Sequence, residues 1–165
     1  MTDAKMPHPT PPAGTAARPE TAARQRWMSL LAKASPDAVR QCRARLGPLP
    51  AYDLLRRPEI GLVMVRGRMG GEGGPFHLGE MTVTRCSVRL SSSGVVGHAW
   101  IAGREAAQAE DAALLDALLQ SPGDHSALEA ELTRLEEAQT ARREEASRKA
   151  AATRVDFFTM VRGED

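Results

Sequence analysis

The sequence predicts an α+β domain in which helices flank a short antiparallel sheet. Two patterns predict this class. Apolar residues recur at helical spacing in residues 21–46 and again after residue 103, whereas residues 60–102 follow the spacing of strands. The connections between those strands are turns of a few residues, too short for the crossovers that parallel strands need. The length of 165 residues, with 42% hydrophobic and 26% charged residues, fits a single globular domain.

Residues 1–20 carry five of the eleven prolines and no long apolar stretch, which predicts a disordered leader rather than a signal peptide. We therefore expect one domain over residues 21–165. The longest uninterrupted apolar run, residues 62–65, is far shorter than a membrane span. A net charge of +1 argues against nucleic acid as the main ligand. The two cysteines belong to no CxxC or Cys/His group, which is typical of reduced thiols in a cytoplasmic protein.

A helical hairpin is predicted over residues 21–46. In its first helix Trp27, Leu30 and Leu31 recur at helical spacing. Ser35 followed by Pro36 is typical of an N-cap with proline at the first helical position, and so begins a second helix. Gly47 and Pro48 end that helix.

The centre of the chain predicts an antiparallel meander of three to four strands. Residues 60–65 are apolar at nearly every position, which predicts a largely buried strand. A turn is expected over residues 70–74. In the next stretch, residues 76–90, the apolar residues switch from odd to even positions between Val83 and Cys86. This switch predicts a bulge or a break into two strands. Residues 95–101 supply the last strand.

Two helices are expected at the C-terminal end. The first is rich in leucine and alanine, ends before Pro122 and should cover one face of the sheet. Its acidic residues, Glu110, Asp111 and Asp116, have ordinary surface spacing. The second helix begins near residues 124–126, but residues 136–154 include no large apolar side chain. We interpret residues 136–165 as an arm that extends from the domain.

An apolar cluster follows that arm, in a part of the sequence where polar residues are the norm. It consists of Val155, Phe157, Phe158, Met160 and Val161. Such a cluster must dock on its own domain, on a second copy or on a different protein. We expect an intermolecular site, because the arm is long enough to carry the cluster away from the core.

The glycine-rich and arginine-rich run over residues 66–74 allows two interpretations. Arg66 and Arg68, with Arg104 where the next helix begins, are candidates for contact with a phosphate, because guanidinium groups and converging backbone amides bind anions. The run leads into a strand, however, and lacks the GK[ST] of a Walker loop. The spacing alone therefore favours a flexible hairpin connection over a module that binds phosphate or nucleotide.

No catalytic residue and no metal site is predicted. The histidines are dispersed, and the sequence has no HExxH, GxSxG or paired-cysteine motif. From the residues alone, the chain is therefore a subunit or a binding module without a self-contained active site.

Several strings along the chain resemble one known family. They are Arg24-Gln25-Arg26-Trp27-Met28, Glu59-Ile60-Gly61-Leu62-Val63, Arg68-Met69-Gly70-Gly71, Ala99-Trp100-Ile101-Ala102-Gly103-Arg104, Leu114-Leu115-Asp116-Ala117-Leu118 and the stretch from Thr153 to Gly163. Through these strings, residues 24–165 resemble PhnG, the small subunit of the bacterial carbon-phosphorus lyase system for phosphonate use.

The resemblance implies a subunit of a cytoplasmic hetero-oligomer, a transferase and lyase complex that contains PhnH, PhnI and PhnJ. With PhnL, that system transfers the ribose triphosphate moiety of MgATP to an alkylphosphonate and releases adenine, giving for example α-D-ribose 1-methylphosphonate 5-triphosphate. The iron-sulfur cluster and S-adenosylmethionine used in the later bond cleavage belong to PhnJ, so no cofactor is expected on this chain. The resemblance carries no catalytic residue onto this sequence, and the isolated chain is expected to be inactive.

Overall fold

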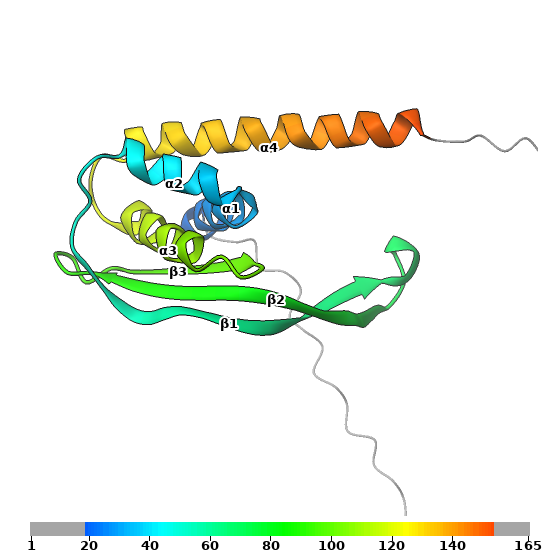
Figure 1. The fold of residues 1–165 in the computed structure, drawn as a ribbon, viewed down its shortest axis with the longest axis horizontal. Coiled ribbons are helices and arrows are strands. Elements are labelled where there is room, and N and C mark those ends of the chain that lie inside the picture. Colours follow the sequence, from blue (N-terminus) through cyan, green and yellow to red (C-terminus); the bar gives the residue numbers. More distant parts are fainter. Residues whose placement is uncertain (1–18, 154–165) are drawn as a thin grey trace, which may run out of the picture.

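The computed structural model describes residues 19–153 of the chain (Figure 1). Two helices begin the fold, α1 (Pro19–Lys33) and α2 (Pro36–Arg45). The hydroxyl of Ser35 accepts a hydrogen bond from the Ala38 backbone amide at 3.2 Å and so caps α2. The predicted helical hairpin is confirmed. The predicted leader lies outside the described residues except for its last two, which belong to α1.

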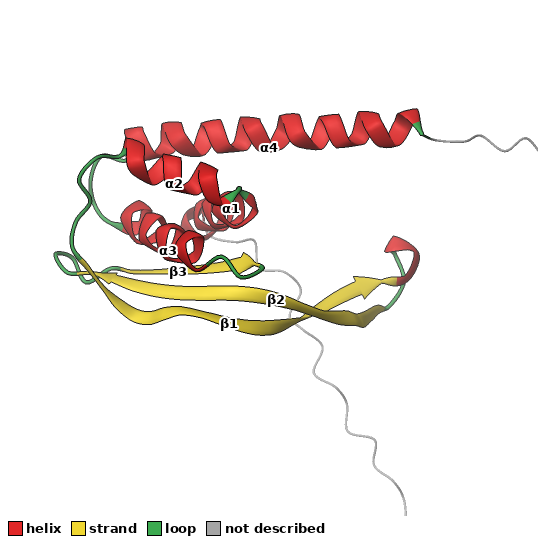
Figure 2. Ribbon diagram, in the orientation of Figure 1, coloured by secondary structure: helices red, strands yellow, loops and turns green. Residues whose placement is uncertain are grey.

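Three strands follow, β1 (Tyr52–Arg68), β2 (Pro75–Leu90) and β3 (Val96–Ala102). They form one antiparallel sheet in the order β1-β2-β3 (Figure 2). A short 3₁₀ helix (Met69–Gly71) connects β1 to β2 and contains two glycines, at φ of 60° and 85°, values that favour glycine. The α+β class, the meander and its glycine-rich turn are therefore confirmed, with three strands.

β1 is longer than predicted, because it begins at Tyr52 rather than near Ile60. The added part includes Pro58, and a proline inside a run normally argues against a strand. β1 is an edge strand, however, so a residue without an amide proton is tolerated there. The register also shifts between Leu54 and Arg56 and between Arg56 and Glu59, so the ladder is irregular around the proline.

β2 is one continuous strand, and the predicted irregularity between Val83 and Cys86 is wrong. Thr84 and Cys86 are buried on the face that packs against the helices, and Val83 is buried on the opposite face. The apolar residues switch from odd to even positions because β2 has buried residues on both faces of the sheet. A register shift does occur in β2, but it lies nearer the turn, where Val65 pairs with Gly79 and the next residue of β1 pairs with His77.

The helices lie in layers on one face of the sheet (Figure 1). α3 (Ala106–Gln120) packs directly on β2 and β3, as predicted, and α1 and α2 pack on α3. α4 (Ser126–Ala152) lies across α1 and α2 on the outside. The core between these layers is aliphatic. Its centre consists of residues that are each at most 2% exposed, namely Leu31, Val39, Val88, Leu114 and Leu132.

Only the first half of α4 packs on the body. Leu128, Leu132 and Leu135 are buried, and the Gln139 side chain donates a hydrogen bond to the Leu30 carbonyl at 2.8 Å. Every residue from 140 to 152 is exposed, so this half of the helix projects from the domain. It matches the first part of the predicted arm. In the described range 19–153, no helix is long and apolar enough to cross a membrane.

Candidate functional site

The β1–β2 hairpin extends beyond the helices, and we call residues 60–82 the hairpin arm (Figure 1). Among the described residues, nine large apolar side chains are exposed, and seven of them lie in this arm. The seven are Ile60, Leu62, Met64, Met69, Phe76, Leu78 and Met81. Such a concentration marks an interaction surface, because monomeric proteins rarely expose contiguous apolar patches.

The prediction that residues 60–65 form a largely buried strand is therefore wrong. Ile60, Leu62 and Met64 are 56%, 63% and 58% exposed. The reason is length, because a helix of 15 residues such as α3 spans about 22 Å. A strand of 16 residues such as β2 spans about 53 Å. The helical layer therefore ends well before the hairpin does.

The exposed side chains lie on both faces of the arm. Ile60 pairs with Thr84 of β2, which is buried against the helices, so Ile60, Leu62 and Met64 lie on the helix-side face. On the opposite face, the ring of Phe76 lies 3.5 Å from the position that a Cβ on Gly67 would occupy. A two-stranded ribbon with apolar residues on both faces is at best marginally stable in water, so the arm needs a partner.

The three candidate arginines do not gather at one point. Arg66 and Arg68 lie at the tip of the arm, where Arg68 Nη1 donates a hydrogen bond to the Gly73 carbonyl at 3.2 Å. Arg104 follows Gly103, which pairs with Thr82 at the root of the arm. Arg66 pairs with His77 and Arg68 with Pro75, five and seven residues of β2 before Thr82, which corresponds to about 17 and 23 Å. In one chain, a single phosphate could not contact all three side chains.

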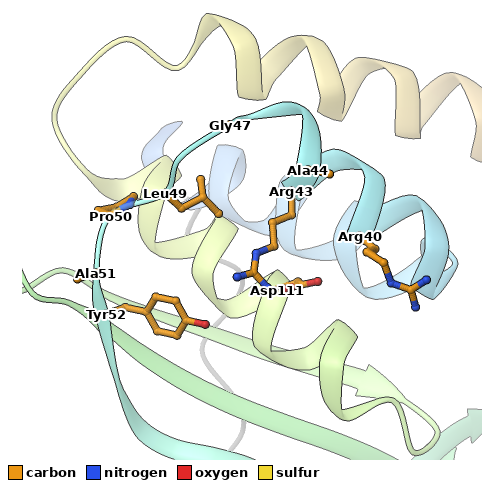
Figure 3. Close-up of a pocket in the computed structure, with 9 residues that line it drawn as sticks. All are labelled: Arg40, Arg43, Ala44, Gly47, Leu49, Pro50, Ala51, Tyr52 and Asp111. Atoms are coloured by element: carbon orange, nitrogen blue, oxygen red, sulfur yellow. Dashed lines mark hydrogen bonds and ion pairs between the residues drawn. The ribbon is translucent and has the colours of Figure 1, made fainter.

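A cavity of about 660 Å³ lies between α2, the start of β1 and α3, as Figure 3 shows. Arg43 donates to Asp111 at 2.5 Å, and the hydroxyl of Tyr52 donates to Glu110 at 2.6 Å. Burial raises the pKa of the Asp111 carboxyl, and Arg43 offsets only part of that rise. Arg40 points along the rim and pairs with Asp37 at 2.8 Å. The charged groups of this cavity thus bind one another and join α2 and β1 to α3.

The prediction of ordinary surface spacing on α3 is wrong for Asp111, which is 6% exposed, and for Asp116, which is fully buried. Asp116 is the more highly connected of the two. Its carboxylate accepts hydrogen bonds from Arg24 at 2.8 and 3.1 Å, from the Trp27 indole at 2.8 Å and from the His98 backbone amide at 2.9 Å. Arg24 and Trp27 belong to the first string of the family resemblance, and Asp116 to the helical one. The role of these residues in this structure is to join α1, α3 and β3.

The remaining groups that could carry chemistry lie apart. His98 Nδ1 is 2.8 Å from the Ser87 hydroxyl, and His125 Nε2 is 2.6 Å from the Ser121 carbonyl oxygen. Within residues 19–153, no three His, Cys, Asp or Glu side chains are placed to hold a metal ion. Burial raises the pKa of both cysteine thiols, Cys42 and Cys86, to about 11, so both are protonated at neutral pH.

The other predicted site lies beyond the described residues. Val155, Phe157, Phe158, Met160 and Val161 all follow residue 153. The hairpin arm is the surface that sequence reasoning missed. The signal that could have found it is the length of the two apolar strands that flank the glycine-rich turn, compared with the shorter helices available to cover them.

Comparisons with known proteins agree with the family resemblance. The family described as "Phosphonate metabolism protein PhnG" matches residues 22–163. A protein of Rhizobium meliloti (strain 1021), named alpha-D-ribose 1-methylphosphonate 5-triphosphate synthase subunit PhnG, is 49% identical over 148 residues. The match covers 87% of this chain and 92% of that relative. The chain therefore belongs to the PhnG family of phosphonate metabolism proteins.

Proposed function

We propose that this chain is the PhnG subunit of an α-D-ribose 1-methylphosphonate 5-triphosphate synthase complex, and that it contributes binding surface rather than a self-contained active site. Two findings support this proposal. A relative with that name is 49% identical to this chain, and the alignment covers nearly the whole length of both proteins. The hairpin arm also presents an apolar surface that requires a partner.

The proposed partners are PhnH, PhnI and PhnJ in a core complex, with PhnL joining for the transfer reaction in the cytoplasm. In that reaction an oxygen of the alkylphosphonate forms a bond to C1′ of the ribose of MgATP. The glycosidic bond from C1′ to the adenine nitrogen breaks, and adenine leaves with a proton. The iron-sulfur cluster and S-adenosylmethionine would serve PhnJ in the subsequent step, so this chain would hold no cofactor of its own.

The observation that carries the proposal is the pattern of exposure along β1. Leu62 and Met64 are more than half exposed although they stand in a regular strand, and the described part of the chain provides no element that covers them. Burying apolar side chains of this size stabilises an interface by about 1.5–3 kcal/mol each. A subunit interface would account for this exposure, because the arm would then be buried in the assembly.

The test is a substitution in the arm with a matched control in the same strand. The chain is co-expressed with PhnH, PhnI and PhnJ, and the complex is isolated through a tag on PhnI. We expect Leu62→Lys to reduce recovery of this chain at least tenfold, which corresponds to about 1.4 kcal/mol of binding free energy. Leu55→Lys should leave recovery unchanged, because Leu55 is similarly exposed, at 50%, but lies outside the arm.

The second measurement is adenine release from MgATP with methylphosphonate when PhnL is added. Adenine release should require this chain. With the Leu62→Lys variant, adenine release should fall in proportion to the amount of the variant chain recovered in the complex. If the partner subunits release adenine equally well without the chain, the proposed function is rejected. If both lysine variants assemble normally, the arm is not the subunit interface.

A further inference from the structure

One edge of β2 is open along the hairpin arm. β3 ends at Ala102, which pairs with Val83, and the Gly103 amide then donates to the Thr82 carbonyl at 2.9 Å. In the described part of the chain, no strand lies on this side of residues 75–81, and all seven are exposed. An open edge of this kind is a template on which another strand can pair.

The backbones of Glu80 and His77 both face this open edge. Alternate residues of an antiparallel strand point to the same side, so the groups of Glu80 point in the same direction as the Thr82 carbonyl. β2 has one extra residue, Leu78, where its register with β1 shifts. The extra residue moves the alternation by one position, so the next residue with its backbone groups at the open edge is His77.

The side chains of Glu80 and His77 lie on the helix-side face of the arm. Glu80 pairs with Met64 and His77 pairs with Arg66, and these two residues of β1 are on the same face because they are two positions apart. The helix-side face of the open edge therefore carries a carboxylate and an imidazole.

The other face of the open edge is apolar. The Phe76 ring and the Leu78 Cβ lie 3.5 and 3.9 Å from the position that a Cβ on Gly67 would occupy, on the face away from the helices. Met81 is on that face as well, because it directly follows Glu80 in a regular part of the strand. Phe76, Leu78 and Met81 are 42%, 66% and 42% exposed.

This edge is complementary to itself across a two-fold axis. An axis that is perpendicular to the sheet and passes just after Leu78 makes two copies of β2 antiparallel and keeps each face on the same side. Glu80 of each copy then lies opposite His77 of the other, so that a carboxylate meets an imidazole. Met81 of each copy lies opposite Phe76 of the other, which brings a thioether against an aromatic ring.

The same register also matches the two ends of the open edge, because Pro75 of each copy lies opposite Thr82 of the other. A regular pair at this position would need a bond from the amide of Pro75 to the carbonyl of Thr82. Proline has no amide, and the Thr82 carbonyl is already bonded to Gly103. The missing donor thus lies opposite the acceptor that needs none, and the pairing uses the whole open edge.

We propose that the hairpin arms of two copies of this chain pair through residues 75–82 of β2 and form one antiparallel sheet across a two-fold axis. Backbone hydrogen bonds join Glu80 of each copy to His77 of the other. A ribbon of two strands is marginally stable in water, and the pairing places it in a wider sheet with an apolar face. The pairing goes beyond the proposed function, because it uses the edge of the arm and leaves Leu62 and Met64 available to the partner subunits.

Cysteine crosslinking of the full chain tests the contact. Leu78→Cys places a thiol beside the axis in each copy, and the native thiols of Cys42 and Cys86 are buried. Leu62→Cys is the matched control, because Leu62 is similarly exposed, at 63%. In the paired arms the two Leu62 positions are separated by at least three strand spacings, about 14 Å, which is too far for a disulfide.

We expect mild oxidation to crosslink the Leu78→Cys chain at least about tenfold faster than the Leu62→Cys chain, because only the first pair of thiols is held within reach. Equal rates would show random collision, and faster crosslinking of the control would show contact through the helix-side face. Either result would overturn the proposal.

A charge exchange tests the register, with the dissociation constant of the dimer measured by sedimentation equilibrium. Glu80→Lys removes the carboxylate that faces His77 in both pairs, and it should weaken the dimer about tenfold. Addition of His77→Glu to this variant restores an anion opposite a cation and should return the constant to within about threefold of its original value. A double variant that is no tighter than Glu80→Lys alone would overturn the register, and an unsubstituted chain that remains monomeric would overturn the pairing.

These results are separable from those for the proposed function. Crosslinking and sedimentation use this chain alone and report contact between copies. Co-purification with PhnI and release of adenine report assembly with the partner subunits. A monomeric chain that supports normal adenine release would reject only the pairing of arms, and a dimer that is dispensable for adenine release would reject only the role in the synthase complex.

Discussion

Asp116 joins three segments that are far apart in the sequence. Its carboxylate receives donors from Arg24 and Trp27 on α1 and from the His98 amide on β3, and the carboxylate itself is fully buried. A buried carboxylate is stable only when its oxygens are hydrogen-bonded and its charge is compensated. Arg24, whose side chain is 34% exposed, supplies that compensation from the edge of the core.

We expect Asp116→Asn to lower the free energy of unfolding by about 3 kcal/mol. The amide NH₂ group that replaces one carboxylate oxygen would face hydrogen-bond donors and could not accept from them. Arg24 would also lose its counter-charge. Urea denaturation measures the change. Asp37→Asn is the control, because the pair between Asp37 and Arg40 is largely exposed and should change stability by no more than about 0.5 kcal/mol. Equal changes in the two variants would contradict the role assigned to Asp116.

At this scale, the sequence identified the N-cap and the apolar positions but not the buried polar contacts. Ser35 caps α2 as predicted, because capping is a local property of a few neighbouring residues. Asp116 is separated from Arg24 by 92 residues, and no local pattern relates the two positions. Burial of a carboxylate depends on which helices cross over it, so it could not be predicted from the spacing along α3.

At the scale of elements, α3 and β3 approach so closely that a side chain on Gly97 is excluded. A Cβ at this position would overlap the Ala113 carbonyl and the Ala117 amide of α3, both of which are backbone groups. Small residues on both elements therefore set the distance between the helix and the sheet. This contact fixes the layer on which α1 and α2 also pack.

Gly97→Ala should lower the free energy of unfolding by about 3 kcal/mol, because backbone atoms cannot rotate away as a side chain can. Gly61→Ala provides the control in the same sheet, since a Cβ there meets nothing within 4 Å. That variant should keep or slightly raise stability, by up to about 1 kcal/mol, through its less flexible unfolded state. Thermal unfolding of both variants decides the point, and an unchanged midpoint for Gly97→Ala would refute the close contact.

The elements themselves were largely predictable, but what covers them was not. Helical spacing, Pro122 and the glycine-rich turn located α3 and the turn of the hairpin within a few residues, although β1 begins earlier than expected, at Tyr52. Apolar runs indicate strands that need burial without specifying the element that buries them. For Leu62 and Met64 that element is absent from the described part of the chain, so a run typical of a buried strand forms an exposed arm.

The whole molecule has a packed body and two projections that leave it on the same side, the hairpin arm and the second half of α4 (Figure 1). The two projections have opposite character. The arm is apolar and has unpaired backbone groups, whereas residues 140–152 of α4 are exposed throughout and include no large apolar side chain. Neither contributes to the core, because no residue of 60–82 or of 140–152 is buried. The body should therefore fold without residues 140–165.

A variant that ends at Gln139 tests whether the body folds without the projecting half of α4. The urea midpoint of this variant should match that of the full chain, because residues 140–152 are exposed throughout. The free energies of unfolding of the two chains should agree to within about 0.5 kcal/mol. A full-length chain that is clearly more stable than the variant would mean that residues after Gln139 pack on the body, against the exposure of residues 140–152.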